Sequence, residues 1–211
     1  MSLINFEAIR KAPLNDTPFP FTIVPDFLQQ QELDSLSKDF PAIEFPGSIP
    51  LEQVKYGSRF GALIQELQGE QLRAAIEEKL SVNLQGRPVL ITVRGKTRKR
   101  DGQIHTDTKS KLVTLLLYFN PVWQADGGRL RILKDGKHLD DYVAEVPPSI
   151  GTALIFKVTD NCWHGHKPFE GVRKTLQLNY LTDESALHSH LSRHNFSGKL
   201  KSLKHWIKGN Y

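Results

Sequence analysis

The sequence predicts an α+β fold that is mainly β: a jelly roll with N-terminal helices packed on one outer face of its sheet. Two observations lead to this fold class. Apolar residues recur at helical spacing in the N-terminal third, whereas short strand-like runs separated by polar turns follow from residue 88 onward. Within the strand-rich part, His105 and Asp107 form a His-x-Asp pair, and the next candidate metal ligand comes more than 50 residues later. A jelly roll can bring such a distant side chain to the pair from another strand.

We expect one domain over the whole chain, 1–211, because this length suffices for one sizeable core and no linker or repeat marks a second. Three parts are expected: an N-terminal arm with helices (1–87), a jelly-roll core that carries the catalytic residues (88–182), and a basic C-terminal extension (183–211).

The N-terminal part begins with an arm at 1–17, which has no clear period, and a short strand at 19–24. Asp26 is expected to cap a helix that Pro41 stops. The buried side of this helix would be formed by Leu28, Leu33, Leu36 and Phe40.

A loop is predicted for 42–59, which is rich in Pro and Gly, and a helical stretch for 63–80. Leu72, Ile76 and Leu80 follow one another at four-residue spacing, so they share one face of that helix. Gly69 is expected to divide the stretch in two.

The core begins with a strand at 88–94 and a strongly basic loop at 95–102. Residues 112–119 are apolar on both faces, which indicates a strand covered on both sides. Further strands are predicted at 130–133, 152–157 and 173–181.

Polar side chains form one row along the last of these strands, while the other row is mostly apolar. Such a row is unusual for a closed core and suits a cavity wall that holds a dicarboxylate. The row consists of Arg173, Thr175, Gln177 and Asn179, and we expect Thr114 and Tyr118 to share one face of the strand 112–119.

Two imidazoles and one carboxylate suit Fe(II) and leave about three octahedral positions open. His105 and Asp107 would supply two of these ligands. His164 and His166 compete for the third place, because residues two apart on a strand point to the same side.

The order of these residues carries a family resemblance. The pattern is His105-x-Asp107, the run 112–120, Trp123, Gly127-Gly128-x-Leu130, Pro148, Gly151, Phe156, Trp163-His164 and Arg173. It resembles the prolyl-4-hydroxylase-like branch of the Fe(II) and 2-oxoglutarate-dependent dioxygenases, from about Pro20 to Leu181.

The resemblance implies a double-stranded β-helix, the cupin-like form of the jelly roll, with Fe(II) held by His105, Asp107 and His164. His164 is preferred over His166 because it follows Trp163, as in the family motif. The iron would bind 2-oxoglutarate and O2, release succinate and CO2, and use ascorbate as a reductant.

The same resemblance implies that Arg173 and Tyr118 bind the far carboxylate of 2-oxoglutarate, and Thr114, Gln177 and Asn179 are expected to line the same cavity. Arg173 follows His164 by nine residues, often one fewer than in the family, so the loop 168–172 is expected to be slightly shortened.

Because Asp107 is present where related halogenases have a small residue, we expect hydroxylation of a C–H bond. A prolyl or other amino-acid residue, a glycan or a small metabolite would all fit as substrate. The alternatives are a non-catalytic metal-binding jelly roll and a hydrolase or isomerase that uses zinc.

The net charge of +5 permits an anionic substrate and does not require nucleic acid. Substrate contacts are predicted for His166, Arg94, Arg98 and Arg100. An amphipathic helix is expected around Leu200, Leu203 and Ile207, whereas His188, His190 and His194 suit a solvated tail better than a zinc site.

The chain has one cysteine, no apolar stretch that could span a membrane and no signal-peptide pattern at its start. We therefore expect a cytoplasmic protein.

Overall fold

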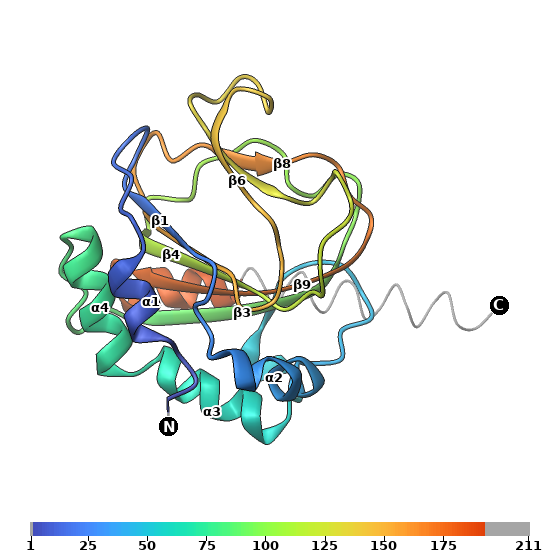
Figure 1. The fold of residues 1–211 in the computed structure, drawn as a ribbon. Coiled ribbons are helices and arrows are strands. Elements are labelled where there is room, and N and C mark those ends of the chain that lie inside the picture. The colour runs from blue at the N-terminus through green and yellow to red at the C-terminus, as the bar shows by residue number, and fades with distance from the viewer. Residues whose placement is uncertain (1, 193–211) are drawn as a thin grey trace.

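A computed structural model describes residues 2–192 of the chain. Two antiparallel sheets face each other, and four helices lie on the outer side of the larger one (Figure 1). The helices are α1 (Phe6–Lys11), α2 (Leu33–Asp39), α3 (Ser58–Leu67) and α4 (Glu70–Leu80). This arrangement confirms the predicted jelly roll with N-terminal helices, although the sheets do not close into a barrel.

The larger sheet has the strand order β1-β7-β4-β9-β3-β2. Its strands are β1 (Phe21–Val24), β2 (Ile49–Pro50), β3 (Val89–Thr97), β4 (Lys111–Tyr118), β7 (Ala153–Lys157) and β9 (Gly171–Leu181). The smaller sheet has the order β6-β5-β8, with β5 (Leu130–Leu133), β6 (Tyr142–Val146) and β8 (His164–His166).

The main hydrophobic core lies between the helices and the larger sheet. Leu63 and Ile76 from the helices are fully buried with Leu115 and Leu178 from β4 and β9. Each of these side chains contributes about 1.5–3 kcal/mol by leaving water. A second cluster, which includes Tyr118, Leu154 and Phe156, lies on the other face of the sheet. The strand β4 is therefore covered on both sides, as its apolar sequence predicts.

Gly69 separates α3 from α4, as expected, and its backbone forms the N-cap of α4. The expected helix start at Asp26 is wrong: the chain becomes helical only in a 3-10 turn at Gln30–Glu32, before α2. Leu28 instead forms a bridge to Ile4, and Phe27 accepts a hydrogen bond from Asn5. These pairings hold residues 27–28 in an extended form, so the helix cannot include them.

The sequence pattern did not predict three elements: α1, the strand β6, and β2 with its following 3-10 turn at Leu51–Gln53. Residues 184–192 are also helical and pack against Leu90 and Leu181. The helix expected around Leu200, Leu203 and Ile207 lies outside the described residues. Within residues 2–192, no helix is long and apolar enough to cross a membrane.

Candidate functional site

One face of the larger sheet forms the floor of a cavity of about 220 Å³ below the smaller sheet. The register pairs Thr114 with Asn179 and Arg94 with Thr175, and directly paired residues share a face. Arg173, Thr175 and Gln177 all line the cavity. Most of the polar row predicted on the last strand is thus a cavity wall, whereas Asn179 is buried and is not among the described lining residues.

His105, Asp107 and His164 converge at one end of this cavity, with one ligand atom of each within 4.8 Å of the others. The backbones of His105 and His164 exchange two hydrogen bonds of 3.0 Å, which places their ring centroids 4.3 Å apart. This backbone pair therefore brings together two residues that are separated by residues 106–163 in the sequence. It is the one such group of metal-binding side chains among residues 2–192.

Both imidazoles are oriented for metal binding by their own backbones. The Nδ1 atom of His105 lies 2.8 Å from the carbonyl of Gln103, and that of His164 lies 2.8 Å from the carbonyl of Cys162. A carbonyl can only accept, so each Nδ1 carries the proton and each Nε2 keeps its lone pair. Burial and the neighbouring His105 lower the pKa of His164 to about 4, so this ring is neutral at pH 7.

The carboxylate of Asp107 is held at both oxygens. Lys111 donates to Oδ1 at 2.9 Å, and the hydroxyl of Thr114 donates to Oδ2. Burial alone would raise the pKa of Asp107, but Lys111 and His164 outweigh it, and the pKa lies below its usual range. Asp107 is therefore ionised at neutral pH and available as a ligand. Lys111 is a site residue that the sequence analysis missed.

Arg173 lines the cavity, and Tyr118 lies beside it without being among the described lining residues. Arg173 is 5% exposed; its Nε donates to the carbonyl of Gly128 at 2.8 Å, and its Nη1 lies 3.3 Å from Thr175 Oγ1. Its guanidinium carbon is 5.3 Å from the centroid of the Tyr118 ring. The Tyr118 hydroxyl is fully buried and has no hydrogen-bond partner within residues 2–192. An unpaired hydroxyl beside a buried cation is a ready place for an anionic oxygen.

The other predicted cofactor-binding residues are tied to one another. Thr114 Oγ1 lies 3.0 Å from Asn179 Oδ1, which also accepts a 3.1 Å hydrogen bond from Gln177 Nε2. Through Thr114, this group reaches Asp107. The structure thus links these side chains to the metal end of the cavity.

His166 lines the cavity but stands apart from the metal-binding group. Its Nδ1 lies 2.8 Å from the carbonyl of Lys167, and its ring packs over Gly102, where an added Cβ would lie 2.2 Å from the ring. Burial and the nearby Arg173 lower its pKa to about 4.

The basic loop after β3 is folded around one acidic residue. Asp101 accepts hydrogen bonds from the Arg98 backbone at 2.9 Å and from the Arg98 and Arg94 guanidinium groups. Arg94 lines the cavity; Arg98 and Arg100 are not among the described residues that do.

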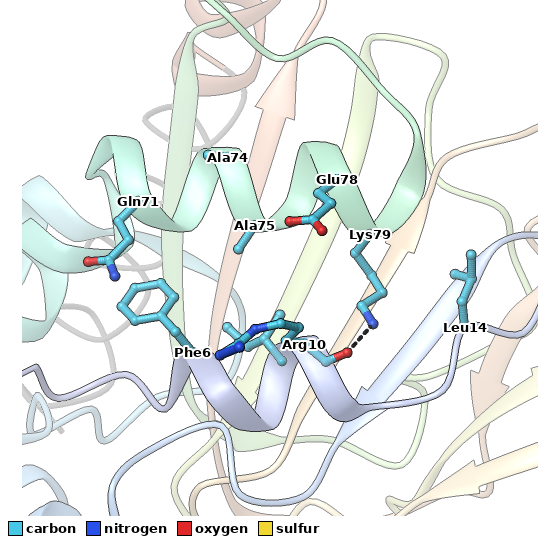
Figure 2. A pocket seen from close by; sticks show the side chains of 9 residues that line it. Phe6, Arg10, Leu14, Gln71, Ala74, Ala75, Glu78 and Lys79 are labelled. Carbon is cyan, nitrogen blue, oxygen red and sulfur yellow. Dashed lines mark hydrogen bonds between the residues drawn. The ribbon is translucent and has the colours of Figure 1, made fainter.

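A larger hollow of about 520 Å³ lies between α1 and α4 (Figure 2), and it shares no lining residue with this cavity. It is lined by side chains such as Phe6, Ala75 and Glu78, and Lys79 donates a 2.9 Å hydrogen bond to the Arg10 carbonyl at its edge. It contains no converging metal-binding side chains. The smaller cavity is therefore the candidate functional site.

The fold thus brings two histidines and one carboxylate together, which is the ligand set typical of non-haem iron oxygenases. Residues 95–181 match the family model of the 2OG-Fe(II) oxygenase superfamily. This matched region, which includes His105, Asp107, His164 and Arg173, is therefore similar to the 2OG-Fe(II) oxygenases. The family resemblance read from the sequence is thereby confirmed.

Solved structures of low sequence identity share the fold. A Pseudomonas putida prolyl-4-hydroxylase matches with a TM-score of 0.53 and 19% identity over 83% of this chain and 90% of that chain. An oxidoreductase of the 2OG-Fe(II) oxygenase family from Burkholderia pseudomallei matches with a TM-score of 0.53 and 12% identity, over 76% and 84%.

A viral collagen prolyl hydroxylase from Paramecium Bursaria Chlorella virus-1, in its 2OG complex, matches with a TM-score of 0.51 and 13% identity, over 77% and 96%. No curated protein matches the sequence significantly.

Proposed function

We propose that this protein hydroxylates a C–H bond of an organic substrate, with Fe(II) held by His105, Asp107 and His164. One observation carries the proposal: this group and Arg173 line the same cavity, and Arg173 lies against the buried Tyr118 ring. The iron and 2-oxoglutarate, when bound, supply the activation of O2, and the products are a hydroxylated substrate, succinate and CO2.

The side chains present fit both groups. Two imidazoles, of which the buried His164 is neutral at pH 7 because its pKa is lowered to about 4, and the ionised carboxylate of Asp107 would satisfy three positions of Fe(II). Arg173 and the Tyr118 hydroxyl would bind the far carboxylate of 2-oxoglutarate. This carboxylate would give the hydroxyl the hydrogen-bond partner that it lacks without the ligand. Thr114 and Asn179 would keep the Asp107 carboxylate in place.

The chain contributes orientation and exclusion of water. His164 is 4% exposed and Tyr118 is fully buried, so both lie in surroundings of low polarity where charge-assisted contacts are strong. A prolyl residue is the first substrate class to test, because similar structures are prolyl hydroxylases by name. Other amino-acid residues, glycans and anionic metabolites follow.

The test is succinate formation from 2-oxoglutarate by the purified protein with Fe(II), O2 and ascorbate. We expect turnover that requires Fe(II), and a mass increase of one oxygen in a substrate from candidate pools. Metal binding without succinate would favour the alternative of a non-catalytic metal-binding jelly roll. Hydrolysis supported by Zn(II), without use of 2-oxoglutarate, would favour a hydrolase.

A further inference from the structure

Arg94 is a cation in the cavity wall that the proposed chemistry leaves unused. We propose that Arg94 forms a substrate subsite for an oxyanion, either a carboxylate or a phosphate, separate from the place where Arg173 binds 2-oxoglutarate. This inference rests on the proposed function, and it deepens it by naming a group that the substrate must carry.

The position of Arg94 is fixed by the sheet. It lies on β3 directly opposite Thr175 of β9, so its side chain starts on the cavity face. Its Nη1 donates to Asp101 at 3.2 Å and its Nη2 to Ser48 at 3.1 Å. With these two contacts the guanidinium is held in place while 27% of the side chain stays exposed. A planar fork held in this way suits paired oxygens of a carboxylate or phosphate.

The charge of the cavity supports an anionic ligand beyond the co-substrate. Arg94, Lys111 and Arg173 line it, and Asp107 is the single carboxylate among its described lining residues. The site therefore has two more positive than negative side chains. Adding Fe(II) and the dianion of 2-oxoglutarate leaves this excess unchanged, because their charges cancel. Lys111 contacts the proposed metal ligand Asp107, and Arg173 is assigned to 2-oxoglutarate, so Arg94 is the remaining cation among the described lining residues.

Asp101, which accepts a hydrogen bond from Arg94, does not remove this excess of positive charge. Asp101 is shared with Arg98, which contacts it through both its backbone and its guanidinium. The Asp101–Arg98 pair is neutral as a unit, and the charge of Arg94 is left over. Since Arg94 also repels Arg173, a bound oxyanion near Arg94 would relieve this repulsion.

Arg98 provides a matched control. It binds the same Asp101 as Arg94 does, yet it is not among the described residues that line the cavity. Substituting either arginine disturbs the same loop, but only Arg94 should change binding inside the site.

The experiment uses the full chain loaded with Zn(II), as a redox-inert metal, and saturated with 2-oxoglutarate so that Arg173 is occupied. Inorganic phosphate and acetate are titrated in separate arms, and binding is followed by the 15N signals of the arginine side chains. We expect wild type and Arg98→Gln to bind one of these anions with similar affinity, and Arg94→Gln to bind it roughly tenfold or more weakly. The stronger arm identifies the oxyanion class.

Three outcomes overturn the inference. Anion binding that Arg94→Gln leaves unchanged, or that Arg98→Gln weakens equally, would show that Arg94 is not the receptor. Weakening of 2-oxoglutarate by Arg94→Gln to the degree seen with Arg173→Ala would make Arg94 a second co-substrate contact. If wild type does not bind 2-oxoglutarate with metal at all, the proposed function fails and this inference fails with it.

Arg94→Lys guards against misfolding of the glutamine variant. It keeps the charge and loses the fork, so we expect phosphate or acetate binding between that of wild type and Arg94→Gln. Affinity equal to wild type would mean that charge alone acts and would overturn the assignment of a guanidinium fork. Melting temperatures of all variants show whether the fold is kept.

Discussion

The two ends of the cavity differ in how completely their polar groups are paired. At the metal end, both oxygens of Asp107 and the Nδ1 atoms of His105 and His164 have partners. At the other end, the buried Tyr118 hydroxyl has none within the described residues. The metal end thus has its ligand geometry built in, whereas the arginine end is completed only by a ligand.

This difference separates two kinds of contribution to the site. The contacts at the metal end orient ligands before a metal arrives, so their loss should affect metal affinity. The unpaired hydroxyl at the other end is costly when buried alone, so a ligand oxygen that accepts from it should bind with a clear gain.

The largest expected effect tests the metal end with two histidines from the same short strand. His164→Ala removes one of three proposed ligands, and we expect Fe(II)-dependent turnover of 2-oxoglutarate to be abolished. The matched variant His166→Ala removes an equally buried imidazole that lies outside the metal-binding group. Metal binding, measured by calorimetry with Zn(II), should be lost in the first variant and kept in the second.

The reverse result, with metal binding lost in His166→Ala and kept in His164→Ala, would exchange the two assignments. His105→Ala and Asp107→Ala extend the test, since each removes one further proposed ligand and should abolish turnover as well.

The next largest effect concerns the arginine end. Arg173→Ala should weaken 2-oxoglutarate roughly ten- to a hundred-fold, because a charge-assisted contact contributes about 1.5–3 kcal/mol. Metal affinity should hardly change, since Arg173 contacts Gly128 and Thr175 and none of the proposed ligands. Calorimetric titration of the Zn(II)-loaded protein with 2-oxoglutarate measures this. An unchanged dissociation constant would remove Arg173 from the co-substrate site.

A smaller effect in the same direction is expected for Tyr118→Phe. The variant removes a neutral donor that is unpaired without ligand, so the loss of 2-oxoglutarate affinity should be about 0.5–1.5 kcal/mol. The ligand-free protein should be as stable as wild type or more so, because the buried unpaired hydroxyl is gone. Thermal unfolding with and without 2-oxoglutarate separates the two effects. A variant that is destabilised without ligand and unchanged in affinity would make Tyr118 a purely structural residue.

The residues of the candidate site were easier to single out in the sequence than some of the elements that hold them. His105, Asp107 and Arg173 could be found because their order and spacing follow a known motif, and the polar row from Arg173 to Asn179 because strand alternation shows it directly. The contact of Lys111 with Asp107 could not be predicted, since an ion pair depends on side-chain placement that periodicity does not describe.

Local pattern also failed where long-range pairing decides the structure. Asp26 looks like a helix cap, but the bridge between Leu28 and Ile4 keeps the chain extended there. The strand β6 is half exposed and directly follows the polar stretch 134–141, so its sequence reads as part of a loop until β5 pairs with it. The sequence of the basic loop showed its positive charge. It did not show that Asp101 accepts hydrogen bonds from both Arg94 and Arg98.

The smallest expected effect concerns Lys99 and Arg100, which are exposed on the loop that joins β3 to the metal end. 2-Oxoglutarate is itself an anion, so exposed positive charge near the cavity should speed its encounter without contacting it. Reversing both residues to Glu should therefore lower kcat/KM for 2-oxoglutarate, measured as succinate formation without added substrate, by a few-fold at most at low salt. The Debye length falls from about 10 Å at 0.1 M salt to about 3 Å at 1 M, so the difference should vanish at high salt.

The control is Arg173→Ala, which should keep most of its loss of kcat/KM at 1 M salt, because a buried pair is screened much less than an exposed charge. The double reversal could instead lower kcat/KM as much as Arg173→Ala does and keep that loss at 1 M salt. The exposed loop would then contact 2-oxoglutarate directly, and the distinction between a distant electrostatic effect and a buried binding contact would be wrong.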